Sequence, residues 1–218
     1  MWRSRMPSQA TLKLDPIRLV VHVGAVAPLI VLILQFVLGG LTANPIRDIQ
    51  LRTGQFTLAI LTASLTCTPL FIITGWQGFL PLRRPLGLYA FGYASLHVIN
   101  LVGLDYQFNL PLLWRDSAQK RYILAGIPAF LILLLLALTS TDRARRWLGN
   151  GWRPLHRFVY LAAALGIVHY LWETKIRMPG PFIYGGIIAM LLLIRIPWVR
   201  IELERLPWRR KRRTDEAS

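Results

Sequence analysis

Residues Ile127–Thr141 read IPAFLILLLLALTST, a run without a charged side chain that continues back to Tyr122. An α-helix rises about 1.5 Å per residue, so a helix of this length crosses most of a hydrocarbon core about 30 Å thick. The whole chain of 218 residues is 54% hydrophobic and only 17% charged, which lies outside the usual range of soluble domains. The sequence therefore predicts an integral membrane protein.

The same test along the chain gives six candidate spans joined by short connections that carry Pro, Gly or charge. They are Ile17–Gly40, Phe56–Trp76, Leu86–Leu104, Tyr122–Ser140, Leu155–Trp172 and Phe182–Val199. The prediction is an all-α membrane protein: an N-terminal segment (1–16), a six-transmembrane-helix bundle (17–199) and a basic tail (200–218). The basic N-terminal segment has no A-x-A cleavage pattern, which favours a retained first helix over a removed signal peptide. The connections leave no room for a soluble nucleotide-binding domain.

The net charge of +16 is unevenly distributed. With six spans, both termini and the second and fourth connections share one side, and that side carries 19 of the 26 Lys and Arg residues. The positive-inside rule makes this side cytoplasmic, so both termini are expected in the cytoplasm. The tail sequence RRKRR is then a contact for membrane lipids and a topology anchor, or alternatively a docking site for a partner. This distribution argues against nucleic acid as a partner.

Four histidines, His22, His97, His156 and His169, fall in or near the ends of these spans, and none of the spans contains an Asp or Glu. A proton relay would need Asp or Glu in mid-membrane, and zinc would usually need Cys or carboxylate ligands as well. Haem iron can be held by imidazole alone in an apolar pocket, so haem b fits this set. Cys67 is the only cysteine, which excludes a C-x-x-C-H attachment and a cysteine-ligated cluster.

The depth of each histidine decides which of them can share one iron. His97 lies 11 residues into the third span and His169 lies 14 into the fifth, a difference in depth of about 4–5 Å. These two are expected to ligate one haem between them. His156 lies 13 residues before His169, roughly 20 Å away along the helix, which is too far to reach the same iron.

His156 therefore indicates a second, inner haem whose other contacts stay open. His22 has a comparable depth and is one candidate partner, while Arg83 and Arg84 are candidates for pairing with haem propionates. A separation of thirteen residues along the sequence also places His156 and His169 about 140° apart around the axis of a straight helix. The fifth span must therefore bend or be overwound, and Gly166 is the expected place. The alternative for each histidine is an interhelical hydrogen bond without a ligand.

Three stretches carry a family resemblance: NPIRDIQLRTGQ (44–55), LGLYAFGYASLH (86–97) and TSTDRARRWLGNGWRPLHRFVYLAAALGIVHYLWETK (139–175). In these motifs the chain resembles the MsrQ family, the haem-binding membrane subunits of bacterial MsrPQ methionine sulfoxide reductase systems, and more widely the transmembrane domain of ferric reductases and NADPH oxidases. The likeness runs from His22 to about Arg195. The family's haem histidines fall on His97, His156 and His169, and one histidine of the four-histidine oxidase pattern is missing from the third helix.

The resemblance implies a haem b electron-transfer subunit in the bacterial inner membrane, with one or two haems. In the family, electrons come from the quinone pool or a cytosolic flavin reductase and pass to MsrP, a periplasmic molybdopterin enzyme that reduces methionine sulfoxide. The family is also associated with FMN, and the catalytic chemistry belongs to the partner. The loop from Asp105 to Lys120 and the turn around Arg47 and Asp48 are the expected docking surface for that partner.

Two other functions stay open on the sequence. A haem-containing transmembrane reductase could use another acceptor, either ferric iron or a different periplasmic oxidoreductase. A small transporter could instead line a polar path with the histidines, but the spans lack carboxylates and paired broken helices.

Overall fold

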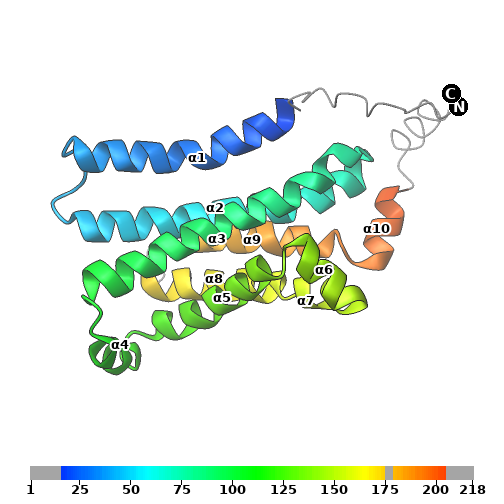
Figure 1. Cartoon of the computed structure of the whole chain (residues 1–218). Coiled ribbons are helices and arrows are strands. Elements are labelled where there is room, and N and C mark those ends of the chain that lie inside the picture. The colour runs from blue at the N-terminus through cyan, green and yellow to red at the C-terminus, as the bar shows by residue number, and fades with distance from the viewer. Residues whose placement is uncertain (1–15, 175–178, 205–218) are drawn as a thin grey trace, which may run out of the picture.

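The computed structural model describes residues 16–174 and 179–204, and every regular element in these two ranges is helical. Several of the Lys and Arg residues counted above lie outside these ranges, among them Arg3, Arg5, Lys13, Lys175, Arg177 and the RRKRR tail. Six longer helices lie side by side along one axis, as Figure 1 shows: α1 (Pro16–Val37), α2 (Pro45–Thr74), α3 (Arg83–Ile99), α5 (Arg121–Leu138), α8 (Val159–Thr174) and α9 (Gly180–Leu193). The described residues thus form a helical bundle.

Short elements occupy the two ends of the bundle. The helix α4 (Leu110–Ser117) lies at one end, and α6 (Asp142–Leu148), α7 (Trp152–His156) and α10 (Pro197–Glu204) lie at the other (Figure 1). We refer to these as the α4 end and the α10 end. Three tighter or wider turns complete the path: the 3₁₀ helices η1 (Gln77–Leu82) and η3 (Gly149–Gly151), and the π-helix η2 (Asn100–Asp105).

Four helical stretches are long and apolar enough to cross a membrane: Pro16–Val37, Pro45–Thr74, Gln77–Asp105 and Arg121–Leu138. A fifth is formed if Gly180–Leu193 and Pro197–Leu203, which meet at an 80° bend, make one span. The α8 helix has 16 residues and is shorter than the 18 residues required of a candidate span. The expectation of an all-α, multi-pass membrane protein is confirmed. The described residues contain four or five candidate spans, compared with the six predicted.

Local sequence signals explain where the long α2 helix begins and ends. The Asn44 side chain accepts a hydrogen bond from the Arg47 N–H and Pro45 follows at the first helical position, a favourable start for a helix. At the other end Gly75 adopts φ +78°, and its N–H bonds to the Phe71 carbonyl. This left-handed cap is inexpensive only for glycine.

Two helix hairpins form the body of the bundle, α2 with α3 and α5 with α8, and they are the closest pairings in the structure. Ala90 on α3 and Ala163 on α8 are fully buried, so small side chains stand where the helices approach most closely. Leu61 and Leu65 of α2 lie in the same core. By contrast, α1 leaves most of its apolar surface exposed, as expected for a helix that faces lipid.

The structure corrects the prediction for the fifth span. Gly166, where an adjustment was expected, lies inside α8, and the helix is unbroken there. The break is instead at Arg157–Phe158, between α7 and α8, where the Arg157 N–H bonds to the Pro154 carbonyl and the Phe158 N–H to the Leu155 carbonyl. These bonds are one residue shorter than α-helical bonds and tighten the turn that follows a proline.

Candidate functional site

A cavity of about 660 Å³ lies between the two hairpins. Side chains from α2, α3, η2, α5 and α8 line it, and most of that lining is apolar, as with Leu58, Leu61, Phe130 and Leu133. Leu113 of α4 also lines it, which puts the cavity toward the α4 end. It has the size and character of a site for an organic ligand or cofactor.

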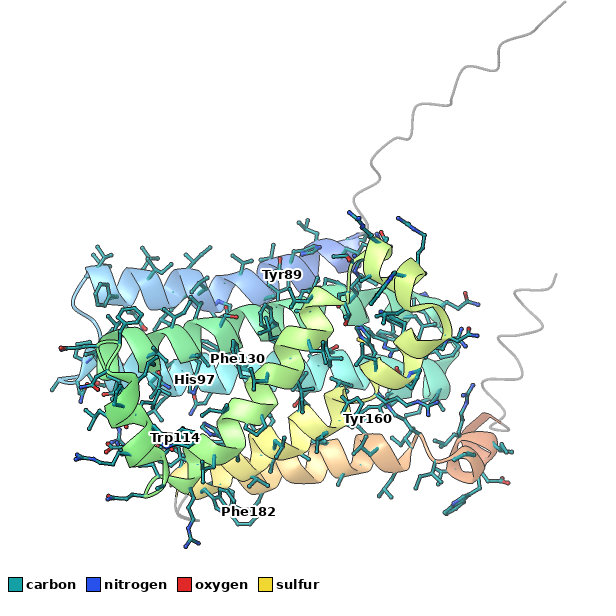
Figure 2. All side chains as sticks on the ribbon, turned by 60° about the horizontal axis from the view of Figure 1, so that its bottom comes forward. Tyr89, His97, Trp114, Phe130, Tyr160 and Phe182 are labelled. Atoms are coloured by element: carbon teal, nitrogen blue, oxygen red, sulfur yellow. The ribbon has the colours of Figure 1, made fainter. Side chains whose placement is uncertain are left out.

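His97 and His169 face each other in this cavity. Their ring centroids are 5.9 Å apart and the ring planes meet at 81°. His97 comes from the last turn of α3 and His169 from the C-terminal half of α8, and the two are 72 residues apart in the sequence. Figure 2 shows His97 inside the bundle, in the same half as Trp114 of α4. The structure therefore brings together the two histidines whose depths match in the sequence.

A backbone carbonyl of α5 orients His169. Its Nδ1 lies 2.6 Å from the Tyr122 carbonyl oxygen, which makes Nδ1 the protonated nitrogen, because a carbonyl only accepts. The ring also lies against Gly126, where a Cβ would come within 2.7 Å of Nδ1. Nε2 is then left with a lone pair, the form in which an imidazole binds a metal.

His97 is oriented in the same way by α2. Its Nδ1 lies 2.9 Å from the Gln50 carbonyl oxygen, so this nitrogen too carries the proton. The Gln50 amide nitrogen lies 3.1 Å from Nε2, on the other side of the ring. Gly54 lies against the ring, and a Cβ there would come within 3.1 Å of Cε1. Each histidine thus has a carbonyl at Nδ1 and a glycine against its face.

Charged groups line the α4 end of the cavity. The Arg47 guanidinium on α2 lies 3.9 Å from the Glu173 carboxylate on α8, which links the two hairpins. The Lys120 ammonium donates to the Tyr106 hydroxyl at 2.8 Å and to the Asp116 carboxylate at 3.2 Å. These bonds raise the pKa of Lys120, the bond to Tyr106 having the largest effect, and the Lys120 bond lowers the pKa of Asp116. Both groups are therefore charged near neutral pH.

The structure places the remaining predicted site residues at other positions. His156 is half-buried and stacks on Trp152 at 4.0 Å between ring centroids, with its Nε2 3.2 Å from the Thr139 hydroxyl. His22 on α1 is exposed, and its Nδ1 lies 2.9 Å from the Tyr89 hydroxyl. Neither of these histidines lines the cavity, and each has a different partner.

The two arginines predicted as propionate contacts also lie outside the lining. Arg84 forms an exposed ion pair with Asp142 at 3.4 Å. Arg83 is also exposed.

Four residues that contact the histidines were missed as site residues: Gln50, Gly54, Tyr122 and Gly126. Gln50 and Gly54 belong to the stretch NPIRDIQLRTG, which the sequence predicted as an outer connection between the first two spans. Their contact with His97 crosses from α2 to α3 and needs the tertiary pairing. Gly126 carries a weak signal, a glycine in the middle of an apolar helix, where alanine is preferred unless space is short.

Comparison with known proteins agrees with this architecture. Residues 50–167 match the family described as ferric reductase like transmembrane component. The chain is 41% identical, over 185 residues, to a protein of Rhodospirillum rubrum named protein-methionine-sulfoxide reductase heme-binding subunit MsrQ. That match covers 84% of this chain and 89% of the relative. The chain therefore belongs to the ferric-reductase-like transmembrane family and, within it, to the MsrQ family.

Proposed function

We propose that this chain binds haem b in the cavity, and that Nε2 of His97 and Nε2 of His169 would hold its iron. The distance between the rings carries the proposal. At a metal–imidazole bond of about 2 Å, one metal ion would fit between two imidazoles whose centroids lie about 6 Å apart. The observed 5.9 Å agrees with this distance. The Nδ1 bonds to the Gln50 and Tyr122 carbonyls leave both Nε2 atoms as acceptors, and the Gln50 amide that lies 3.1 Å from His97 Nε2 would turn aside for a metal to bind there.

The rest of the cavity also suits a porphyrin. Its apolar walls, formed by side chains such as Leu58, Phe130 and Leu133, exclude water and keep the local dielectric low. The cations Arg47 and Lys120 at the α4 end are the residues that would hold anionic carboxylates. The bound group would supply one-electron redox chemistry. The chain would ligate it, orient the ligands and exclude solvent.

We further propose that the chain passes electrons to a periplasmic methionine sulfoxide reductase of the MsrP type. The relative from R. rubrum is named as the haem-binding subunit of such a system, which supports this assignment. The cavity lies at the α4 end, where exposed Trp114 and Arg115 belong to the surface that we propose for docking of the partner. Sulfoxide reduction itself would take place on the partner.

The proposed topology has six spans in the bacterial inner membrane, with both termini in the cytoplasm. In addition to the four long apolar stretches, α8 would be the fifth span and the α9–α10 pair the sixth. The concentration of Arg and Lys on one side, which includes Arg143, Arg145, Arg153 and Arg157 near the α10 end, supports this orientation. The α4 end is then periplasmic. The basic tail would contact lipid headgroups.

The electron donor, either quinol or a cytosolic flavin reductase, would reach the chain from the α10 end. FMN is proposed as a further cofactor on the basis of the family resemblance. The second haem at His156 also stays a prediction. What supports it is the half-buried position of that ring. His22 stays the alternative partner, and Arg84 a candidate propionate contact.

The test of the proposed function uses the purified protein in lipid nanodiscs. It should contain haem b with the spectrum of a low-spin, six-coordinate centre, and the reduced form should be reoxidised by MsrP plus methionine sulfoxide. Rapid reoxidation by ferric citrate, with no response to MsrP, would assign the chain to another acceptor. A folded protein that stays colourless when expressed with ample haem would overturn the proposal.

A further inference from the structure

A histidine and a tyrosine are hydrogen-bonded to each other on the surface of the bundle, where α1 lies beside α3. Nδ1 of His22 lies 2.9 Å from the Tyr89 hydroxyl, and the two rings meet edge to face with centroids 5.7 Å apart. Figure 2 shows Tyr89 next to α1. His22 is exposed, and both residues belong to stretches that are long and apolar enough to cross a membrane. In a bilayer these two side chains, which we call the lipid-facing pair, therefore meet lipid.

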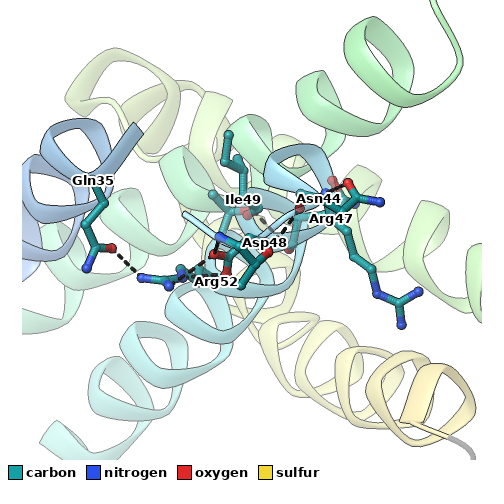
Figure 3. Close-up of polar contacts among 9 residues, drawn as sticks. Gln35, Asn44, Arg47, Asp48, Ile49 and Arg52 are labelled. Carbon is teal, nitrogen blue, oxygen red and sulfur yellow. Dashed lines mark hydrogen bonds and ion pairs between the residues drawn. The ribbon is translucent and has the colours of Figure 1, made fainter. Parts of the chain in front are cut away.

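Polar groups that face lipid are costly, because they lose their hydrogen bonds to water. The simplest explanation for the pair is attachment of α1, but other contacts already hold that helix. At its far end the Gln35 side chain accepts from Arg52, which Asp48 holds in place (Figure 3). Nearer the middle, the Tyr93 hydroxyl donates to the Ala25 carbonyl at 2.7 Å. Attachment of α1 therefore does not by itself account for the lipid-facing pair.

The lipid-facing pair has unused hydrogen-bonding capacity. Among the residues that the structure describes, neither side chain has a second hydrogen bond. With Nδ1 of His22 donating to the Tyr89 oxygen, Nε2 is an acceptor and the hydroxyl is a donor. An imidazole also takes up and releases a proton at physiological pH. The pair thus offers an acceptor, a donor and a proton-accepting group to a ligand that arrives from lipid.

The helix surface beside the pair has room for a flat ring. Gly92, three residues after Tyr89 on α3, has nothing within 4 Å of the position that a Cβ would take. Leu88 and Leu96 lie four residues to either side of this glycine, so the three share one face of the helix, and both leucines are exposed. A ring placed there would lie against carbon, with its hydroxyl at the lipid-facing pair.

The pair is also close to the cavity. Tyr89 and His97 both belong to α3, and the eight residues between them correspond to about 12 Å along the helix. Phe91 of α3 stacks on Phe130 of α5 with ring centroids 6.0 Å apart, and Phe130 lines the cavity. An electron that leaves a ring beside Tyr89 therefore has a short path to the cavity through packed side chains.

We propose that the lipid-facing pair is the site at which a hydroquinone dissolved in the bilayer is oxidised. The occupant has to be soluble in lipid, carry hydroxyl groups for His22 and Tyr89, and give up protons together with electrons. A hydroquinone meets all three conditions. This inference rests on the proposed haem function and selects one of the two donors proposed above. It also removes His22 from the candidate ligands of the inner haem.

Oxidation of one hydroquinone releases two electrons and two protons and converts its two hydroxyl groups to carbonyls. One hydroxyl would donate to Nε2 of His22, which takes the proton as the O–H bond breaks, while Tyr89 donates to the same oxygen. The two electrons pass one after the other to the ferric haem of the proposed cavity. His22 lies six residues, about 9 Å, from the start of α1 at the α10 end. Each proton can therefore leave to water there before His22 takes the next.

Two substitutions separate the roles of the pair. His22→Gln keeps a polar side chain but cannot carry the proton, and Tyr89→Phe removes only the hydroxyl. Tyr93→Phe is the matched control, because it also removes a hydrogen bond between α1 and α3. Each variant in nanodiscs is first checked for wild-type haem content and for full reduction by dithionite, which needs no binding site.

The measurement is the rate of haem reduction by decylubiquinol in the absence of oxygen, followed at several quinol concentrations. A general base contributes about 10²- to 10⁴-fold, so His22→Gln should lower the maximal rate by about 100-fold or more. Loss of one hydrogen bond in Tyr89→Phe should raise the quinol concentration that gives half the maximal rate by about three- to tenfold. Tyr93→Phe should match the wild type in both quantities.

Wild-type kinetics in His22→Gln and Tyr89→Phe would overturn the inference. An equal loss in Tyr93→Phe would overturn it too, since the pair would then act only through the packing of α1. A haem that a flavin reductase reduces but decylubiquinol does not would also overturn it, and would leave the proposed haem function intact. A wild-type protein without haem would refute the proposed function, and this inference with it.

Discussion

The glycine beside each histidine gives a graded test of the site. A Cβ at Gly126 would lie 2.7 Å from His169 Nδ1, whereas ordinary contact begins at about 3.4 Å, so the ring must move by about 0.7 Å. That movement disturbs the 2.6 Å bond from Nδ1 to the Tyr122 carbonyl. At Gly54 the nearest atom of His97 would be 3.1 Å away, so about 0.3 Å is needed there. Gly92 on α3 has nothing within 4 Å and serves as the control.

The expected cost of Gly126→Ala combines overpacking, about 1–3 kcal/mol, with a weakened hydrogen bond of about 1 kcal/mol. About 1.4 kcal/mol corresponds to a tenfold change in affinity, so a total of about 2–4 kcal/mol should lower haem affinity by about 30- to 700-fold. Gly54→Ala should show a smaller loss. Gly92→Ala should bind haem as the wild type does, with unchanged or slightly higher stability, because alanine favours a helix over glycine by about 1 kcal/mol.

The assay is a haem titration of the three variants in nanodiscs, followed by the reduced-minus-oxidised difference spectrum. The order of affinities should be Gly92→Ala, then Gly54→Ala, then Gly126→Ala. Wild-type affinity and spectrum in Gly126→Ala would refute the reasoning, since a ring displaced by the new methyl group cannot keep the same ligation. An equal loss in Gly92→Ala would show that the effect is general destabilisation.

Three further predictions concern other parts of the chain. Asn44→Ala removes the cap of α2 and should lower the free energy of unfolding by about 1 kcal/mol, measured as a shift of the denaturation midpoint; an unchanged midpoint would show that the cap is not needed. Asp116 has a lowered pKa through its bond from Lys120, so its contribution is complete at neutral pH and is lost as the pH falls through about 4 and below. Thermal denaturation at pH 3–6 should accordingly depend less on pH in Asp116→Asn than in the wild type, and equal slopes would contradict this. His156→Ala should remove one haem of two and leave the His97–His169 centre intact; unchanged haem content would refute the inner haem.

The sequence was sufficient for those features that depend on local pattern. Long apolar runs predict membrane helices because an unpaired backbone in lipid is too costly for any other structure here. The depths of His97 and His169 follow from counting residues along two helices, and the structure brings the rings together as that count suggests. The cap at Asn44 and the left-handed end at Gly75 also follow from familiar local signals.

Other features depend on contacts between helices and could not be predicted from the sequence. Hydropathy does not distinguish an α turn from the π turn that begins at Asn100, since both are equally apolar. A bend or overwinding of the fifth span was expected at Gly166, whereas the structure breaks the helix at the tight turn Arg157–Phe158 that follows Pro154. Gln50 was assigned to an outer turn because its hydrogen bonds to His97 require α2 and α3 to pair in one register.

The most direct test of the central claim is the haem content per polypeptide of His97→Ala and His169→Ala, with His22→Ala as the control outside the cavity. Both cavity variants should lose the same haem and its low-spin spectrum while they remain folded, since each removes one ligand of a single iron. His22→Ala should keep that centre. Full haem content and an unchanged spectrum in either cavity variant would contradict the assignment of the cavity as a haem site with these two ligands.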